Sequence, residues 1–257
     1  MIILLTDFGY SPYVGIMKGV IYQTWPGSMV LDLYHHVKPQ DVREGAWLLA
    51  ANFVYFPPGS IFLAVVDPGV GYHRQALVVQ TSHYFFVGPD NGLLYPATEK
   101  DGLVQAYCLE IPPGASNVFH GRDVFAPAAA RLEKGENPAL YGKPTTIAGK
   151  LNFYLEQHEG EVVTVDHFGN IVTNLPFTSV DVKQGRPDYL VTLSQSGPTK
   201  AKVFYQGRMQ RYRTYAEAPA DELFLIEGSS RTLELSLKNG AASSRIGAET
   251  GMRVRVE

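Results

Sequence analysis

The 257-residue sequence lacks the features that define several large protein classes. Its one cysteine, Cys108, excludes an intramolecular disulfide network and a cysteine-based zinc site, and its apolar neighbours are typical of a buried structural thiol. No apolar run approaches membrane-spanning length, and residues 1–5 lack a basic flank, so they predict a first strand and not a signal peptide. A formal net charge of -3 provides no basic surface. We therefore expect a cytoplasmic protein without a nucleic-acid or membrane partner.

Signature motifs of common enzyme classes are also absent. The sequence contains no Gly-x-Ser-x-Gly elbow, no Walker loop and no Gly-x-Gly-x-x-Gly turn. The tripeptide at 7–9, Asp-Phe-Gly, matches a kinase motif, but the other kinase motifs are missing. Adjacent His35 and His36 would point to opposite sides of an extended segment, and no helical two-histidine spacing occurs, so a metal site is disfavoured. We expect one of them to be a loop histidine satisfied by backbone, and we expect no metal and no cofactor.

The first part of the sequence alternates strand-like and helix-like segments. Apolar runs at 2–6, 29–33 and 61–66 predict buried strands, and helical spacing predicts helices at 14–22, 41–53 and 124–132. Asp41 is the expected N-cap of the second helix. Segments 76–80 and 84–88 predict a hairpin. This alternation predicts that residues 1–155 form an α/β domain with a mostly parallel sheet and helices on both faces.

The pattern changes after about residue 155. Short strand candidates separated by Gly, Pro, Asn and Ser lie at 161–165, 171–175, 189–193, 202–205, 223–226, 233–237 and 252–256. Regular short spacing without helical stretches is typical of antiparallel β structure. Residues 156–257 are therefore predicted to form a smaller antiparallel β-barrel-like domain.

Three polar segments follow predicted strands or precede a predicted helix. Asp67 follows the strand at 61–66, where proline and glycine end the run, and Arg74 comes seven residues later. Asp7 ends the first strand, where one carboxylate could grip two ribose hydroxyls. His120 lies before the helix at 124–132. Because α/β sheets bind ligands at the carboxyl ends of strands, these residues predict a site, although a turn carboxylate and a solvated Asp67–Arg74 ion pair remain alternatives.

Six motifs occur in an order that is typical of one family. They are LLTDFG at 4–9, YVGIMKG at 13–19, VVDPGVG at 65–71, PDNGLL at 89–94, FHGRD at 119–123 and DHFGN at 166–170. Together they closely resemble the S-adenosylmethionine hydroxide adenosyltransferases, which are adenosine-forming S-adenosylmethionine hydrolases related to the fluorinase and chlorinase. The resemblance covers essentially the whole chain.

The resemblance implies an activity and an assembly. In this family, water acting as hydroxide attacks the ribose 5′ carbon of S-adenosyl-L-methionine, releasing L-methionine and leaving adenosine. It implies a homotrimer whose active sites lie between the N-terminal domain of one subunit and the C-terminal domain of its neighbour. Asp67, Arg74 and His120 match the family's water-handling triad, and Asp7 matches the aspartate that holds the ribose hydroxyls.

Residues of the C-terminal domain match the family's substrate contacts. Asp166 matches the aspartate that meets the methionine ammonium, and Asn170 matches the adenine-reading asparagine. Tyr215 matches the aromatic residue that stacks on adenine. Ser229 and Ser230 fall, in a looser alignment, where the family contacts the methionine carboxylate.

The chemistry is consistent with this resemblance. A sulfonium leaves as a neutral thioether, so the difficulty lies in aligning a weak water nucleophile and removing its proton. Arg74 can hold Asp67 ionised, and either Asp67 or His120 can accept the proton. The residue types do not decide between these two bases.

Departures from the wider family bear on the reaction. The carboxylate of Asp67 would repel a halide. Gln40 stands where the fluorinase has a tryptophan, and Ser11 stands where many members have an aspartate. The sequence therefore favours the hydrolase, with a halogenase and a non-catalytic binder of adenosine or S-adenosylmethionine as alternatives.

Overall fold

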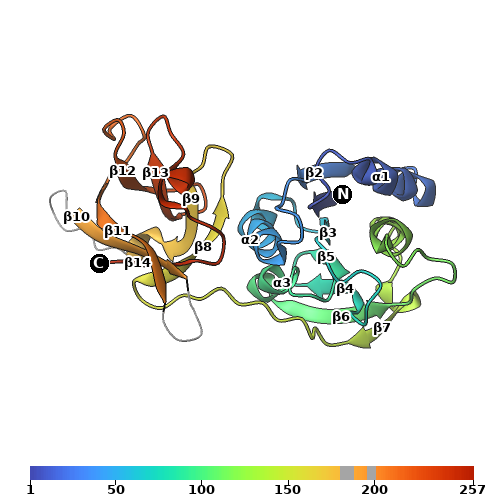
Figure 1. The fold of residues 1–257 in the computed structure, drawn as a ribbon. Helices are drawn as coiled ribbons and strands as arrows, with labels where there is room; N and C mark the ends of the chain where they lie inside the picture. The colour runs from blue at the N-terminus through green and yellow to red at the C-terminus, as the bar shows by residue number, and fades with distance from the viewer. Residues whose placement is uncertain (180–187, 196–200) are drawn as a thin grey trace. The chain divides into compact units, whose positions relative to one another are not determined.

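The computed structural model describes residues 1–179, 188–195 and 201–257, which divide into two compact units, Met1–Leu151 and Asn152–Glu257 (Figure 1). Each unit has its own buried apolar core. The predicted combination of an α/β unit and a β-barrel unit is confirmed.

The first unit contains one mixed sheet. Its strands are β1 (Ile2–Thr6), β2 (Val30–Tyr34), β3 (Ile61–Val65), β4 (Ala76–Thr81), β5 (Phe85–Pro89), β6 (Leu103–Leu109) and β7 (Gly142–Thr145), in the order β2-β1-β3-β5-β4-β6-β7. The pairs from β2 to β5 are parallel, whereas those from β5 through β4 and β6 to β7 are antiparallel. The predicted parallel character holds for one half of the sheet, because the predicted hairpin reverses the chain direction in the other.

Helices cover both faces of this sheet. They are α1 (Tyr13–Thr24), α2 (Val42–Asn52), α3 (Tyr95–Asp101) and α4 (Ala126–Glu133), with short turns η1 (Phe53–Tyr55), η2 (Gly121–Phe125, a π-helix) and η3 (Pro138–Leu140). Consecutive residues of β1 enter different cores: Leu4 packs with α1 and α4, whereas Leu5 packs with α2 and α3. Burial on both faces explains the unbroken apolar runs of β1 and β3.

A side-chain cap fixes the start of α2 but not that of α4. Asp41 caps α2 as predicted, because its carboxylate accepts a hydrogen bond from the backbone N–H of Glu44 at 3.0 Å. Asp123 does not cap α4. It lies inside η2, pairs with Arg122, and accepts a hydrogen bond from the backbone N–H of Ser116 at 2.8 Å.

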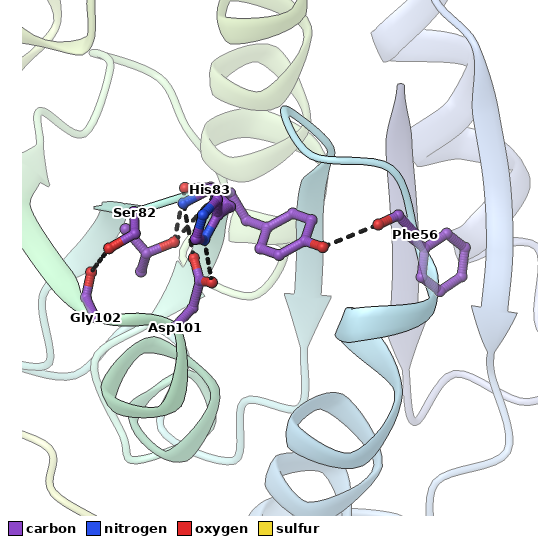
Figure 2. Close-up of polar contacts among 7 residues, drawn as sticks. Phe56, Ser82, His83, Asp101 and Gly102 are labelled. Atoms are coloured by element: carbon purple, nitrogen blue, oxygen red, sulfur yellow. Dashed lines mark hydrogen bonds and ion pairs between the residues drawn. The ribbon is translucent and has the colours of Figure 1, made fainter.

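Polar contacts fasten the β4–β5 hairpin to its surroundings (Figure 2). Asp101, the last residue of α3, accepts from the backbone N–H of His83 and pairs with His83 Nδ1, both at 2.9 Å. The hydroxyl of Ser82 donates to the carbonyl of Gly102 at 3.3 Å. Because that hydroxyl is not hydrogen-bonded to His83, these side chains do not form the nucleophile-to-base relay that a Ser-His-Asp set requires.

The second unit is a closed β-barrel. Its strands are β8 (Glu159–Val165), β9 (Ile171–Pro176), β10 (Asp188–Gln195), β11 (Lys202–Arg211), β12 (Leu223–Glu227), β13 (Thr232–Leu237) and β14 (Arg253–Val256), in the order β10-β11-β12-β13-β9-β8-β14. All seven predicted strands are confirmed. The barrel also carries η4 (Phe177–Ser179) and a short helix, α5 (Ala242–Ile246), which the sequence did not predict, and β11 pairs with β12 in parallel.

Two further expectations concern single features. Cys108 lies on β6 and is partly rather than fully buried, with its Sγ 3.8 Å from the carbonyl oxygen of Leu109. Among the described residues, no helix combines the length and apolar character needed to cross a membrane.

Candidate active site

Asp67, Arg74 and His120 lie together just beyond the end of β3. Arg74 Nε donates to both carboxylate oxygens of Asp67 at 3.0 Å, and Arg74 Nη2 also contacts Asp67 Oδ2. The same Nη2 donates to His120 Nδ1 at 2.9 Å. The side chains of Arg74 and Asp67 are 9% and 5% exposed, so the alternative of a solvated ion pair is wrong.

The Arg74 contact fixes the tautomer of His120. A guanidinium has donors and no acceptor, so His120 Nδ1 must accept, and the proton of the neutral imidazole lies on Nε2. Burial and the positive charge of Arg74 lower the pKa of His120 below 6.5, against the opposing charges of Asp67 and Asp123. The imidazole is therefore neutral near pH 7 and presents an N–H donor.

The loop that carries Asp67 and Arg74 packs closely on the segment that carries His120. Gly71 has a φ of +80°, and a side chain there would overlap the carbonyl oxygen of Asn117. The guanidinium carbon of Arg74 lies 5.4 Å from the ring centre of Phe125. Arg74 Nη1 is buried and has no hydrogen-bond partner within the described part of the chain. The cluster is thus held in place while one donor is left unused.

Asp7 lies in the same pocket as Asp67 and His120. This pocket has a volume of about 400 Å³. Its polar lining residues are Asp7, Ser11, Gln40, Asp67 and His120, and its aromatic ones are Phe8, Tyr13 and Phe119. The backbone N–H of Gln40 donates to Asp7 Oδ2 at 2.9 Å, which fixes one oxygen of that carboxylate.

A polar network that the sequence did not predict lies next to the turn that carries Asp7. Thr6 Oγ1 lies 2.9 Å from His35 Nδ1, and Asp32 Oδ1 lies 3.0 Å from His35 Nε2. Lys18 Nζ donates to Asp32 Oδ2 at 2.6 Å. The ring of His35 contacts side chains from β1 and β2, so His35 is not the backbone-satisfied histidine expected of the His35–His36 pair. The same residue's carbonyl accepts from the backbone N–H of Gly9 at 2.6 Å, so the network supports the 7–9 turn.

A second pocket lies in the barrel unit. It has a volume of about 910 Å³. Its lining includes Asp166, Asn170, Tyr215, Ser229, Glu234 and Lys238, whereas Ser230 lies outside the lining. Among the described residues, no group of three His, Cys, Asp or Glu side chains is arranged to hold a metal ion in either unit.

The predicted Asp166 and Asn170 form one rigid turn at the edge of this second pocket. Asp166 Oδ1 accepts from the backbone N–H groups of Phe168 and Asn170 at 2.9 and 2.8 Å. Asp166 Oδ2 accepts from Asn170 Nδ2 at 2.8 Å. The carboxylate of Asp166 therefore orients the amide of Asn170, which keeps its carbonyl oxygen for other partners.

Tyr215 and Glu234 face the same pocket. The Tyr215 ring is edge-on to Phe224 with 5.8 Å between ring centres, and its hydroxyl donates to Glu234 Oε2 at 3.3 Å. Sequence reasoning missed Glu234. The available signal was a charged residue inside β13, where the polar side chains of Thr232, Glu234 and Ser236 alternate with leucines.

The fold and these pockets define an α/β unit with a buried carboxylate–guanidinium–imidazole cluster, joined to a β-barrel with an amide and an aromatic ring in its pocket. The sequence matches the family models described as SAM hydroxide adenosyltransferase N-terminal domain, over residues 2–142, and SAM hydroxide adenosyltransferase C-terminal domain, over residues 160–255. The chain belongs to the SAM hydroxide adenosyltransferase family, and the predicted family is confirmed.

Relatives with names and structures agree with this assignment. A Thermus thermophilus protein named (R)-S-adenosyl-L-methionine hydrolase is 38% identical over 98% of this chain and 97% of its own length. A fluorinase from an Actinoplanes species is 24% identical over 70% of this chain and 73% of its own. The crystal structure of an uncharacterized conserved protein from Thermotoga maritima has a TM-score of 0.88 and 32% identity, with full coverage of both chains.

Proposed function

We propose that this protein is an enzyme that hydrolyses S-adenosyl-L-methionine at the ribose 5′ carbon, giving adenosine and L-methionine. The observation that carries the proposal is the buried Asp67–Arg74–His120 cluster, which shares one pocket with Asp7. The name of the 38% identical relative supports the same reaction.

The reaction needs a positioned water molecule and a proton acceptor. The water oxygen forms a bond to the 5′ carbon as the carbon–sulfur bond breaks, and the sulfur keeps the bonding electrons as a neutral thioether. His120 Nδ1 already accepts from Arg74, and its Nε2 carries a proton, so neutral His120 orients the water and Asp67 takes the proton. Arg74 holds the Asp67 carboxylate in place through its hydrogen bonds and stabilises the developing hydroxide.

The remaining predicted residues bind the substrate in this proposal. Asp7 holds the ribose hydroxyls through the oxygen not fixed by Gln40, Asn170 reads adenine, and Tyr215 stacks on it. Asp166 meets the methionine ammonium. Ser229 and Ser230 bind the methionine carboxylate, with Ser229 already in the pocket lining.

We also propose a homotrimer whose active sites combine the first unit of one subunit with the barrel of its neighbour. The first pocket holds the water-handling groups, while Asn170 and Tyr215 line the other pocket, so neither pocket has the full set. Co-refolding Asp67→Ala chains, which lack turnover, with Asn170→Ala chains, which have a raised KM, tests this arrangement. Shared sites include some with two intact halves, so a fraction of the activity regains the native KM. Sites within one subunit show only the raised KM of Asn170→Ala, and the oligomer size follows from ultracentrifugation.

Location and cofactor use complete the proposal. We propose a cytoplasmic enzyme that needs neither metal nor cofactor. Turnover should therefore persist after dialysis against a chelator, and a loss that added zinc restores would contradict this part.

Product analysis separates the three candidate functions. Purified protein is incubated with S-adenosyl-L-methionine with and without fluoride or chloride, and products are followed by chromatography. Equimolar adenosine and L-methionine indicate the hydrolase. Halide-dependent 5′-halo-5′-deoxyadenosine indicates a halogenase, which the fluorinase relative keeps open as the second candidate. Binding without turnover indicates a non-catalytic binder.

A further inference from the structure

The barrel pocket contains a buried carboxyl group, Glu234, that the proposed reaction does not use. Glu234 lies in the middle of β13, where it pairs with Ile226 of β12 and Val172 of β9. It is 7% exposed, yet it lines the pocket. One carboxyl oxygen accepts from Tyr215 at 3.3 Å, and the other packs against Gly228, where any side chain would overlap it.

The charged groups around Glu234 leave it uncompensated. The pocket-facing groups are Asp166 from the 166–170 turn, Tyr215 from the loop after β11, Glu227 from the end of β12 and Lys238 after β13. Lys238 Nζ instead donates to the carbonyls of Ala216 and Ala218, at 3.0 and 2.9 Å. Within the described ranges, no cation lies at ion-pair distance from Glu234.

Asp166 differs from Glu234 although both carboxylates face the pocket. Both oxygens of Asp166 accept hydrogen bonds from N–H groups of its own turn. Within the part of the chain that the structure describes, Glu234 accepts a hydrogen bond only from the Tyr215 hydroxyl. Burial, followed by the negative charge of Asp166, raises the pKa of Glu234, and the Tyr215 hydrogen bond lowers it in part.

A pocket of this kind distinguishes ligands by charge. S-adenosyl-L-methionine carries a sulfonium, whereas adenosine and the thioether S-adenosyl-L-homocysteine have the same nucleoside without that charge. We propose that Glu234 is the charge-selecting residue of the barrel pocket, which makes it bind a sulfonium nucleoside in preference to a neutral one. Specificity is a difference between two affinities, so the residue would favour substrate over the adenosine product. The choice of ligands rests on the function proposed above.

Calorimetry on non-hydrolysing protein measures this selection directly. In an Asp67→Ala background, dissociation constants are compared for S-adenosyl-L-methionine, S-adenosyl-L-homocysteine and adenosine, with and without Glu234→Gln. Glutamine keeps the size of the side chain and can accept from Tyr215. The preference for the sulfonium ligand should fall by about tenfold, the size expected for one partly screened charge pair, while both neutral ligands change by less than about threefold.

Glu222→Gln provides the matched control. Glu222 is exposed in the same unit and does not line the pocket, and its substitution removes the same net charge. Solvent screening should keep its effect on the preference below about twofold. An equal change of ligand preference in Glu234→Gln and Glu222→Gln would overturn the proposal, since the preference would then depend only on the net charge of the protein.

The number of protons released on ligand binding provides a second test, because it would not change if Glu234 had only a structural role. A bound cation favours ionised Glu234, so the sulfonium ligand should release more protons than the thioether when binding is measured in buffers of different ionisation enthalpy. Glu234→Gln should abolish that difference. If Glu234→Gln does not fold, Tyr215→Phe should lower the preference at fixed pH and move proton release to higher pH, because the hydrogen bond that favours the carboxylate is lost.

Three outcomes overturn the inference. They are an unchanged preference in Glu234→Gln, an equal loss of affinity for all three ligands, and no binding of S-adenosyl-L-methionine by the parent protein. Hydrolysis is measured separately with the unsubstituted chain. A protein that prefers the sulfonium ligand through Glu234 but does not hydrolyse it would retain the inference and overturn the proposed function.

Discussion

The Asp67–Arg74–His120 cluster of the first unit and Glu234 of the barrel differ in whether their charges are paired before a ligand binds. In the first unit, Asp67 is paired with Arg74, and Arg74 also fixes His120. In the described residues of the barrel, no cation pairs with the buried Glu234, and Tyr215 is 44% exposed. A group that is already oriented before the substrate binds lowers the barrier to the reaction. A buried group without a partner instead gains the most interaction free energy when a ligand binds. We therefore expect substitutions in the first unit to change kcat and those in the barrel to change KM.

The largest expected effect is the loss of turnover in Asp67→Ala and His120→Ala. Each removes a group that handles water, and the loss of a positioned proton acceptor or donor reduces rates by roughly 10²- to 10⁴-fold. Substrate binding should remain measurable by calorimetry, because the barrel pocket is untouched. Undiminished kcat in both variants would remove the basis for assigning chemistry to the first unit.

The sequence contained much of what defines that first unit. Asp67 and Asp7 follow apolar runs that are buried as strands, and the end of a strand is where a sheet exposes functional groups. The turn at 67–71 was readable because proline and glycine restrict the backbone in known ways. These signals are local, so the sequence predicted that Asp7 and Asp67 follow strands β1 and β3.

Other features depend on contacts between distant segments and were not readable. His35 meets Thr6 only because β1 and β2 are neighbours. Glu234 gains its importance from burial beside Asp166, far away in the sequence. The tautomer of His120 depends on which nitrogen faces Arg74, which no sequence pattern specifies.

The next largest effect tests the barrel. Asn170→Ala removes the amide that is oriented by Asp166. A polar group of the adenine ring then lacks its hydrogen-bond partner, so KM should rise by about tenfold, equivalent to about 1.4 kcal/mol. The kcat should change much less. Initial rates over a range of substrate concentrations separate the two constants. A fall in kcat at unchanged KM would contradict the assignment of KM effects to the barrel.

A smaller effect concerns pH. Burial and Arg74 lower the pKa of His120, so in the folded protein the imidazole becomes protonated only at a pH lower than 6.5. The fall of kcat on the acid side of its pH profile should therefore also lie below pH 6.5. The unfolded chain takes up the proton first, so the stability contributed by neutral His120 is present above pH 6.5 and is lost as pH falls through 6.5 toward the folded pKa. Arg74→Gln should raise the pKa of His120. Nitrogen NMR of the ring measures this shift and the tautomer, even where turnover is too low to follow.

An unshifted His120 in Arg74→Gln would mean that burial alone sets its pKa. Glutamine can still donate to Nδ1, so retention of the Nε2-protonated tautomer in this variant would separate the effect of the hydrogen bond from that of the charge. Lys143→Gln on β7, where the lysine side chain is exposed, serves as the control for net charge, since Lys143 is not among the groups that perturb His120.

The smallest expected effect is on stability and links the α2 cap to Asp7. Asp41 caps α2, and the preceding residue, Gln40, has a φ of +68° and donates its N–H to Asp7. Asp41→Ala removes the cap and should cost about 1 kcal/mol of unfolding free energy, which lowers the melting temperature by roughly 2–4 °C in a protein of this size. Asp41→Ser should restore most of the loss, because serine also caps. If the loop after β2 relaxes with the cap, KM rises in the alanine variant and recovers in the serine variant. A lower melting temperature with an unchanged KM would instead show that Gln40 is held independently of the helix. In that case β1 and the turn at 7–9, not the α2 cap, would determine the orientation of Asp7.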